Sequence, residues 1–362
     1  KPQKVKKQLL DLSLIDWDEY YFDEEAASRI VDFARTFIKH VKAQWAGQGV
    51  EFDDWQEEIV RTFYGWKKRK NGLRRFRTLY LEVPRKNGKS FLGSIIALYQ
   101  LLADHEFGAE VYSAATDKKQ ARLVFKTAVD MLDFAPVLKK RCKVTKEGIE
   151  VPSTKSVYVP LSAEAYTKDG LNASAIVFDE LHAQPTRDLY DVLRTSMNAR
   201  LQPVEVYITT AGKDITGIGY EVHEYAEKII AGILKDETFL GVIYAAKVDD
   251  DWKDEKTHIK ANPGWGKSVI PDNFRAELRK AINMPSSIPT FKRLYLNIWT
   301  EAGQNWMPWE KWHPLSEEYT EADLLDRPCW VAVDLSKRID ITALTYYFPD
   351  DDGVSFRSIT KF

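Results

Sequence analysis

Hydrophobic residues follow two different spacings along this chain of 362 residues. Near the amino terminus they lie three and four positions apart, in residues 24–45 and 52–66, and this spacing predicts amphipathic helices. From residue 78 onward, short apolar runs alternate with helical patterns. Five of these runs have the length of buried strands: residues 79–83, 110–114, 156–161, 175–178 and 204–209. Such alternation predicts an α/β fold in which a mostly parallel sheet is covered by helices.

The pattern changes after residue 212. Residues 213–300 combine helical patterns with one strand-like run at 239–246, and we expect a small subdomain appended to the sheet. Three strand patterns at the end of the chain predict the beginning of a second sheet. The predicted parts are a helical lead-in, an α/β core, the small subdomain, a linker and the start of a second α/β domain, at residues 1–72, 73–212, 213–300, 301–327 and 328–362.

The linker region is rich in tryptophan. Tryptophans in a connector that contains proline more often pack two domains together than stack on nucleic-acid bases. We therefore interpret them as packing residues: Trp299, Trp306, Trp309 and Trp312.

The composition supports a globular protein, since 44% of the residues are hydrophobic and 12% are aromatic. No apolar run approaches the roughly 18 residues that span a bilayer, and the amino-terminal stretch turns acidic before a signal-like core could form. Cys142 and Cys329 lie far apart, without the spacing of a disulfide framework or a zinc site. These features indicate a reducing cytoplasm and no membrane.

The net charge of −2 argues against a protein coated in positive charge, but the basic residues are clustered. Residues 67–77 hold seven Lys or Arg in eleven positions. This segment fits a solvated hairpin with its turn at Asn71-Gly72, and it equally fits a nucleic-acid contact.

A polar turn between the strand pattern at 79–83 and the helical pattern from Phe91 has the features of a phosphate-binding loop. Backbone N–H groups of such a turn surround phosphate oxygens, the lysine neutralises charge and the serine hydroxyl can ligate Mg²⁺. The usual motif begins with Gly six residues before the lysine, where this chain has Val83. A solvated basic turn is the alternative, but the flanking strand and helix favour the phosphate site. The loop residues are Pro84, Arg85, Lys86, Asn87, Gly88, Lys89 and Ser90.

The same Gly-Lys-Ser recurs in residues 261–268, ANPGWGKS. No apolar strand precedes it, and Pro271 follows too soon for a good helix to begin at the serine. We interpret this second copy as a turn.

Hydrolysis needs carboxylates beside the phosphates, and the strand pattern at 175–178 ends in Asp179-Glu180. An aspartate at such a strand end orients Mg²⁺ or its water, and the adjacent glutamate can polarise the attacking water. His182, two residues on, fits a polar cap and is given no role.

Two further motifs allow both a functional and an ordinary interpretation. The run at 204–209 ends in Thr209-Thr210-Ala211-Gly212, which can sense the γ-phosphate or form a simple turn. Trp55-Gln56 in the lead-in can recognise adenine, the ring by stacking and the amide by reading the base edge, although such a pair is by itself a weak signal.

Taken in chain order, these motifs and a strand that ends in Asp334 resemble the large terminase subunit of tailed bacteriophages over residues 50–362. In that order they are Trp55-Gln56, the loop at residues 85–90, Asp179 to His182, Thr209 to Gly212, the turn at residues 261–268 and the strand pattern at residues 330–334. The resemblance implies an ATP-driven motor with a P-loop ATPase core and a lid. The motor threads double-stranded viral DNA through the portal protein into a capsid. It also implies a small terminase subunit as partner, a pentameric ring, and the host-cell cytoplasm, with transient docking on the procapsid. The resemblance implies that Arg85 to Ser90 form the phosphate loop and that Asp179 is the carboxylate on the Mg²⁺ side. It also implies that Glu180 is the base that activates water and that Thr209 to Gly212 couple hydrolysis to movement.

The resemblance also implies a ribonuclease-H-like nuclease that uses Mg²⁺ or Mn²⁺. Asp334 matches its first metal ligand, but such a site needs several carboxylates, and the chain stops before the others. Asp340 is a weak additional candidate. Ring motors also take a cation from the neighbouring subunit, for which Lys168, Arg194 and Arg200 are candidates by position.

Two rival functions remain. A DExH helicase is suggested by Asp179 to His182, but it needs a second motor domain after residue 212. A DNA clamp with an inactive nucleotide site is suggested by Val83 and the basic segment 67–77, but it gives Glu180 no purpose.

Overall fold

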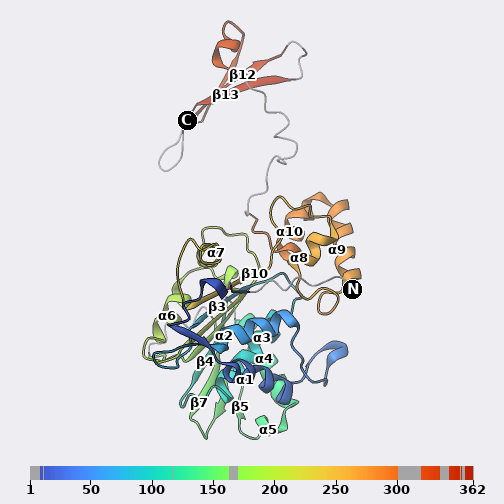
Figure 1. The fold of residues 1–362 in the computed structure, drawn as a ribbon. Coiled ribbons are helices and arrows are strands. Elements are labelled where there is room, and N and C mark those ends of the chain that lie inside the picture. The colour runs from blue at the N-terminus through green and yellow to red at the C-terminus, as the bar shows by residue number, and fades with distance from the viewer. Residues whose placement is uncertain are drawn as a thin grey trace. The chain divides into compact units, whose positions relative to one another are not determined.

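The computed structural model describes residues 9–10, 12–116, 118–162, 170–300, 319–334, 342–350, 352 and 355–361. The chain divides into two compact units, Lys1–Ala302 and Gly303–Phe362, and each unit has its own sheet. Figure 1 shows their elements. Among the described residues, no helix is both long and apolar enough to cross a bilayer.

The main sheet of the larger unit has eight strands in the order β10-β3-β9-β8-β4-β7-β6-β5. The six strands from β10 to β7 are parallel, whereas β6 and β5 form an antiparallel edge. All five strands predicted for the core are present, and the α/β fold is confirmed. The strands are β3 Thr78–Glu82, β4 Glu110–Ala115, β5 Lys143–Val144, β6 Ile149–Val151, β7 Ser156–Ser162, β8 Ala175–Asp179, β9 Val204–Thr209 and β10 Phe239–Ile243.

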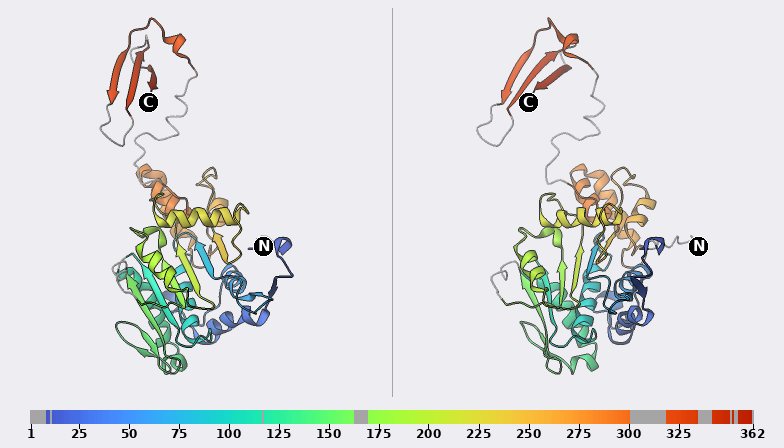
Figure 2. Two further views of the ribbon diagram at one scale, coloured as in Figure 1. Left: turned by 90° about the vertical axis from the view of Figure 1, so that its left-hand side faces the viewer. Right: turned by 60° about the vertical axis from the view of Figure 1, so that its left-hand side comes forward.

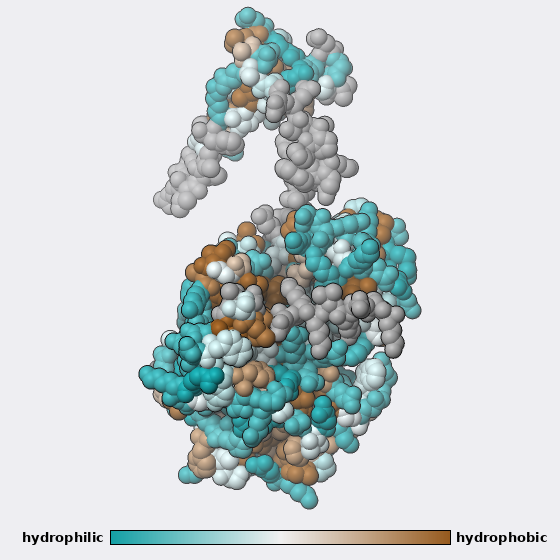
Figure 3. Space-filling model, viewed as in Figure 1, coloured by the Kyte–Doolittle hydropathy of each residue, from teal (hydrophilic) through white to brown (hydrophobic). Residues whose placement is uncertain are grey.

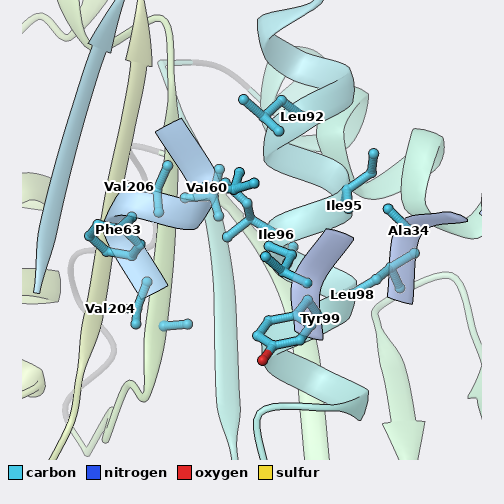
Figure 4. Close-up of a cluster of buried hydrophobic side chains, with 14 of the residues drawn as sticks. Ala34, Val60, Phe63, Leu92, Ile95, Ile96, Leu98, Tyr99, Val204 and Val206 are labelled. Atoms are coloured by element: carbon cyan, nitrogen blue, oxygen red, sulfur yellow. The ribbon is translucent and has the colours of Figure 1, made fainter. Parts of the chain in front are cut away.

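Helices pack on both faces of this sheet, as Figure 2 shows. Alternate residues of β3 face opposite ways: Leu79 and Leu81 join the core with α1 to α4, and Tyr80 joins the core with α6 and α7. Figure 4 shows part of the first core, in which Leu92 and Ile96 of α3 lie toward α2 and β9 and Ile95 lies on the side of Ala34 of α1. The helices are α1 Glu24–Phe37, α2 Asp54–Gly65, α3 Lys89–Leu102, α4 Lys118–Asp133, α5 Pro136–Lys139, α6 Asp188–Ser196 and α7 Ile218–Ile230.

The basic segment 67–77 forms the predicted hairpin, but it is not simply solvated. β1 Tyr20–Phe22 pairs with β2 Trp66–Lys68, and the chain turns at Gly72, whose φ is +67°. Arg74 is buried and pairs with Asp104 at 2.7 Å. The guanidinium of Arg75 lies 4.3 Å from the centroid of the Tyr20 ring. Two arginines of segment 67–77 are therefore structural. Fewer cations of this segment are left for a nucleic-acid contact than the sequence indicated.

Residues 213–300 do not all lie outside the main sheet. α7 covers β10, and β10 pairs with β3, Leu240 opposite Leu79. Three further helices have a core of their own, built around Phe274, Phe291 and Leu296. We call these three helices, residues 255–296, the lid: α8 Glu255–Ala261, α9 Pro271–Asn283 and α10 Ile288–Leu296. The expected subdomain is thus shared between the sheet and the lid.

Apolar side chains on the surface of the larger unit gather over the end of α7, as Figure 3 shows. Ile230 and Ile233 are exposed there. The rest of this face is mostly hydrophilic, as expected for a chain in which 29% of the residues are charged.

The smaller unit contains an antiparallel sheet in the order β11-β12-β13, which confirms the three strands expected at the end of the chain. Asp334 ends β11 and lies opposite Ala343 of β12. The strands are β11 Trp330–Asp334, β12 Ala343–Pro349 and β13 Phe356–Lys361. Short 3₁₀ helices complete the two units: η1 Leu12–Leu14, η2 Ala43–Trp45, η4 Leu181–Ala183, η5 Pro285–Ser287 and η7 Glu321–Leu324.

Candidate active site

The loop between β3 and α3 has the backbone of an anion-binding turn. Lys86 and Gly88 have φ of +72° and +81°, and α3 begins directly after them at Lys89. Left-handed residues before a helix direct successive N–H groups to one side, and the helix dipole adds positive potential there. A Cβ on Gly88 would lie 3.4 Å from Nε2 of Gln56 and would be strained by the backbone conformation. The loop therefore keeps the geometry of a phosphate site although it lacks the first glycine.

Three parallel strands bring the polar groups of the predicted site together at their carboxyl ends. Lys89 Nζ donates to Thr210 Oγ1 at 2.7 Å and lies 3.1 Å from Glu180 Oε1. Ser90 Oγ donates to the Asp179 carboxylate at 3.0 Å. Because parallel strands end at one edge of the sheet, residues more than one hundred positions apart become neighbours. The structure thus assembles the loop, the carboxylates and the threonines into one site.

The two adjacent carboxylates have opposite pKa shifts. Burial, and then the charge of Glu180, raise the pKa of Asp179 to about 7. Burial also raises the pKa of Glu180, but the hydrogen bond from His182 and the charge of Lys89 outweigh it and hold that pKa at about 2. Glu180 is therefore ionised at neutral pH. Its backbone is left-handed, with φ of +56°, a conformation that costs a non-glycine residue free energy.

His182 has a contact that the sequence analysis did not assign. Its Nδ1 lies 3.2 Å from Glu180 Oε2 and 3.0 Å from Thr209 Oγ1. The 3₁₀ turn η4 after Glu180 brings the ring back beside the carboxylate. A histidine two residues beyond the predicted carboxylate was the signal available in the sequence, but the direction in which its ring points depends on this turn.

Thr209 to Gly212 connect the site with the end of the lid. Thr210 Oγ1 donates to Val83 O at 3.1 Å, and Ala211 N donates to Asn297 Oδ1 at 2.7 Å. A Cβ on Gly212 would lie 2.6 Å from the ring of Trp299, so only glycine fits there without a shift. This strand end is therefore packed and hydrogen-bonded rather than a free turn.

Of the two residues predicted to recognise adenine, Gln56 lies beside the phosphate loop and Trp55 lies in the core. Gln56 lies beside Gly88, and its Oε1 also accepts the Asp53 N–H at 3.1 Å. Trp55 is 8% exposed, and its ring packs edge-on against Tyr244, with 5.6 Å between the ring centroids. The prediction that the Trp55 ring stacks on adenine is therefore wrong, because this ring belongs to the core.

The second Gly-Lys-Ser segment is a turn, as predicted, and it touches the phosphate loop. Asn87 Nδ2 donates to Asn262 Oδ1 at 2.9 Å, and Gly264 N donates to Asn87 Oδ1 at 2.9 Å. Asn87 is buried. The lid thus holds the loop through an asparagine pair that local sequence patterns could not reveal.

The remaining candidates lie elsewhere. Arg200 is held by Glu106 at 2.9 Å and by the carbonyl of Asn172, and Arg194 bonds to Tyr190 OH at 3.2 Å. Lys168 and Asp340 lie outside the described residues, as do Trp306, Trp309 and Trp312. Asp334 is exposed at the end of β11. No group of three or more His, Cys, Asp or Glu that could hold a metal occurs in the described part of the chain.

The donors present fit a nucleotide with a divalent cation. The loop N–H groups and Lys89 suit phosphate oxygens. The Ser90 hydroxyl and the Asp179 carboxylate are oxygen ligands, which Mg²⁺ prefers. A Glu180 that is ionised and partly exposed suits the activation of water.

Comparisons with known proteins agree with this chemistry. Two family models match the chain: terminase large subunit, ATPase domain, over residues 54–228, and terminase large subunit, endonuclease domain, over residues 233–362. The chain is 26% identical over 333 residues to the terminase large subunit of Enterobacteria phage HK97, covering 90% of this chain and 63% of that protein. It is 30% identical over 187 residues to Protein YmfN of Escherichia coli strain K12, covering 51% of this chain and 41% of that protein.

Among solved structures, the crystal structure of the HK97 bacteriophage large terminase is similar, with a TM-score of 0.67 and 24% identity. The match covers 92% of this chain and 67% of that one, and it shows that the two share a fold. The chain spans less than two thirds of the length of the two curated relatives, 41% and 63%.

Proposed function

This chain belongs to the large terminase subunit family, and on that premise we propose that it hydrolyses ATP to move double-stranded viral DNA into a preformed capsid. One observation carries the proposal. Lys89, Ser90, Asp179 and Glu180 converge at the carboxyl edge of the sheet, with contacts of 3.0 Å and 3.1 Å. Binding groups for phosphate and an ionised carboxylate for water activation are the minimum for nucleotide hydrolysis.

Each residue has a distinct role in this proposal. The N–H groups of residues 84–88 and the Lys89 ammonium bind phosphate oxygens, while Ser90 and Asp179 hold Mg²⁺. When bound, Mg²⁺ neutralises charge on the phosphates. Glu180 accepts the proton of the attacking water, and His182, whose ring also contacts Thr209, orients its carboxylate. Since Lys89 pairs with Glu180 here, phosphate that draws Lys89 away frees the carboxylate to act as a base.

The proposal extends to partners by family membership. We propose duplex DNA as the translocated substrate, the portal protein and the small terminase subunit as partners, and a pentameric ring in the host cytoplasm that docks on the procapsid. Asp334 on β11 would be one ligand of a two-metal nuclease site using Mg²⁺ or Mn²⁺. The helicase alternative needs a second motor sheet. The described residues after 212 instead form an edge strand, the lid and a small antiparallel sheet.

The first prediction tests hydrolysis itself. We expect wild-type protein to hydrolyse ATP in the presence of linear duplex DNA, measured as steady-state phosphate release. Lys89→Ala and Glu180→Gln should each lower the rate by ~10² or more, as expected when a transition-state contact is lost. Glu180→Gln should keep its ATP affinity, because the amide removes the base and leaves the phosphate contacts.

A matched control comes from α7, where Lys228 and Glu224 form an exposed ion pair at 3.4 Å. Lys228→Ala and Glu224→Gln make the same chemical changes away from the site and should retain wild-type rates. Normal hydrolysis by Glu180→Gln would refute the assigned base. Unwinding of a forked duplex by the wild type would favour the helicase alternative instead.

A further inference from the structure

The lid helix α10 is attached directly to the phosphate loop. Arg85 N donates to the carbonyl of Leu294 at 3.0 Å, so the second residue of the loop is bonded to the last turn of α10. Asn262 extends this contact, because its Nδ2 donates to Tyr295 O at 2.9 Å while its Oδ1 accepts from Asn87. The register of α10 against the loop is therefore fixed, and so is the side on which its neighbouring residues lie.

Arg293, one residue before Leu294, reaches the site from this helix. It is half-buried, and its Nε is buried without a hydrogen-bond partner among the described residues. Burial, and then the charge of Arg85, lower the pKa of the Arg293 guanidinium, while Glu180 raises it. A buried donor without an acceptor destabilises the protein, so an acceptor that bound there would be favoured.

The charges around Arg293 do not balance within the protein. Its interacting carboxylate is Glu180, which already lies 3.1 Å from Lys89 and 3.2 Å from His182. Arg85 adds a second guanidinium that repels the first. Lys89 and Arg293 therefore share the Glu180 carboxylate, and Arg85 adds a third cation beside Arg293. A polyanion with several oxygen atoms can accept hydrogen bonds from these cations and balance their charge.

From this geometry we infer that Arg293 binds the terminal phosphate of ATP in the same subunit and stabilises the charge that develops there during hydrolysis. The inference rests on the proposed ATPase function and adds a catalytic residue from the lid. Arg293 differs in this respect from Arg194 and Arg200, the two described residues that were predicted from their positions as the cation for the phosphates. Arg200 is held by Glu106 and Asn172, and Arg194 bonds to Tyr190, a residue of α6.

Nucleotide binding tests the contact without depending on turnover. Affinities for ADP and for a non-hydrolysable ATP analogue can be measured by calorimetry on wild type, Arg293→Gln and Arg293→Lys. We expect Arg293→Gln to bind ADP as the wild type does and the analogue about tenfold more weakly. Arg293→Lys should recover part of the loss, because it keeps the charge and not the planar fork. The exposed lid residue Arg279 supplies a matched control, and Arg279→Gln should change neither affinity.

Hydrolysis assays then test the catalytic role. Arg293→Gln should lower kcat by ~10² or more, as for other transition-state donors. The melting temperature is measured in parallel, and Arg293→Lys serves if Arg293→Gln does not fold. Equal loss of affinity for ADP and the analogue would overturn the inference, and so would an unchanged kcat. Inactive wild-type protein would defeat the proposed function, while the ratio of analogue to ADP affinity would still decide the role of Arg293.

A mixing experiment distinguishes the same subunit from a neighbour. Arg293→Gln and Glu180→Gln proteins are combined at equal concentration with DNA. If Arg293 acts within its own subunit, every site in a mixed ring lacks one essential group, and activity stays at the mutant level. If it acts on the adjacent subunit, some mixed sites have both groups, and recovered hydrolysis would overturn the inference.

Discussion

Asp179 and Glu180 are neighbours in the chain with opposite ionisation behaviour. Asp179 is buried beside the Ser90 hydroxyl, so burial dominates its pKa and raises it. Glu180 lies beside His182 and Lys89, and these contacts outweigh burial and lower its pKa. The left-handed backbone of Glu180 directs the two side chains to different partners. One residue thus keeps a proton near neutral pH that the other has lost.

The raised pKa of Asp179 predicts the pH dependence of stability without nucleotide or metal. Its pKa is 3.8 as a free side chain and about 7 when folded. Between these values the folded protein keeps a proton that the unfolded chain releases, so stability falls as pH rises and levels off above about 7. We expect Asp179→Asn to remove at most about 4 kcal/mol of this decline, since one pKa unit is about 1.36 kcal/mol.

Urea unfolding at pH 5 and pH 8 would measure this difference. His223, whose pKa Glu82 raises despite burial, also loses its stabilising charge as pH rises, so the comparison must be wild type against variant. Asp32→Asn on the exposed face of α1 is the control and should keep the wild-type slope. An Asp179→Asn slope equal to that of wild type would contradict the assigned shift.

At the scale of elements, α3 approaches the sheet closely at Gly93. A Cβ there would lie 2.6 Å from Cδ1 of Ile208 and 3.2 Å from Cγ1 of Val177. Gly93→Val should therefore lower the free energy of unfolding by about 1–3 kcal/mol through overpacking. Because Lys89 and Ser90 begin the same helix, we also expect weaker nucleotide binding.

Thermal unfolding and nucleotide titration would test this prediction. Gly49→Val is the matched control, because nothing lies within 4 Å of a Cβ at that position and its φ is not left-handed. Similar stability losses in both variants would mean that valine itself, rather than the contact between α3 and the sheet, causes the effect.

Local patterns predicted most elements and the residues that converge at the site. Apolar runs marked the five core strands, and the strand ends placed Lys89, Asp179 and Glu180 at one edge. The same patterns could not place β10 beside β3 or Asn87 beside Asn262, because nothing local encodes which distant segments pair. They also misjudged Trp55, since a tryptophan suits a core as well as a base.

At the scale of the whole larger unit, β10 covers an edge that would otherwise be open. It pairs with all five residues of β3, the strand that leads into the phosphate loop. A chain that ends at residue 234, just past the ATPase family match at 228, would leave β3 unpaired on one side. Exposed hydrophobic edge strands associate with one another, so we expect this shortened protein to aggregate.

Size-exclusion chromatography with light scattering would compare this protein with one that ends at residue 300 and keeps β10 and the lid. We expect the longer protein to stay monodisperse. A monodisperse protein ending at residue 234, with an unchanged melting temperature, would show that β10 is dispensable.

The buried carboxylate of Glu82 joins several distant segments beneath the site. It accepts from Tyr80 OH at 2.5 Å, Asn297 Nδ2 at 3.2 Å and Trp299 Nε1 at 3.3 Å, and His223 Nδ1 lies 2.9 Å away. A buried charge is tolerated only when it is paired in this way. The end of the lid and the strand before the loop are therefore held at one point.

Asn297, which ends α10, gives this arrangement a mechanical meaning. Its side chain is bonded at once to Ala211, Glu82 and Tyr244, so sliding α10 along its axis would break all three bonds, whereas turning about Asn297 would keep them. A lid that turned about Asn297 would carry Leu294, three residues away, through a short path and α9 through a longer one. A small displacement of the phosphate loop would then become a larger displacement of α9.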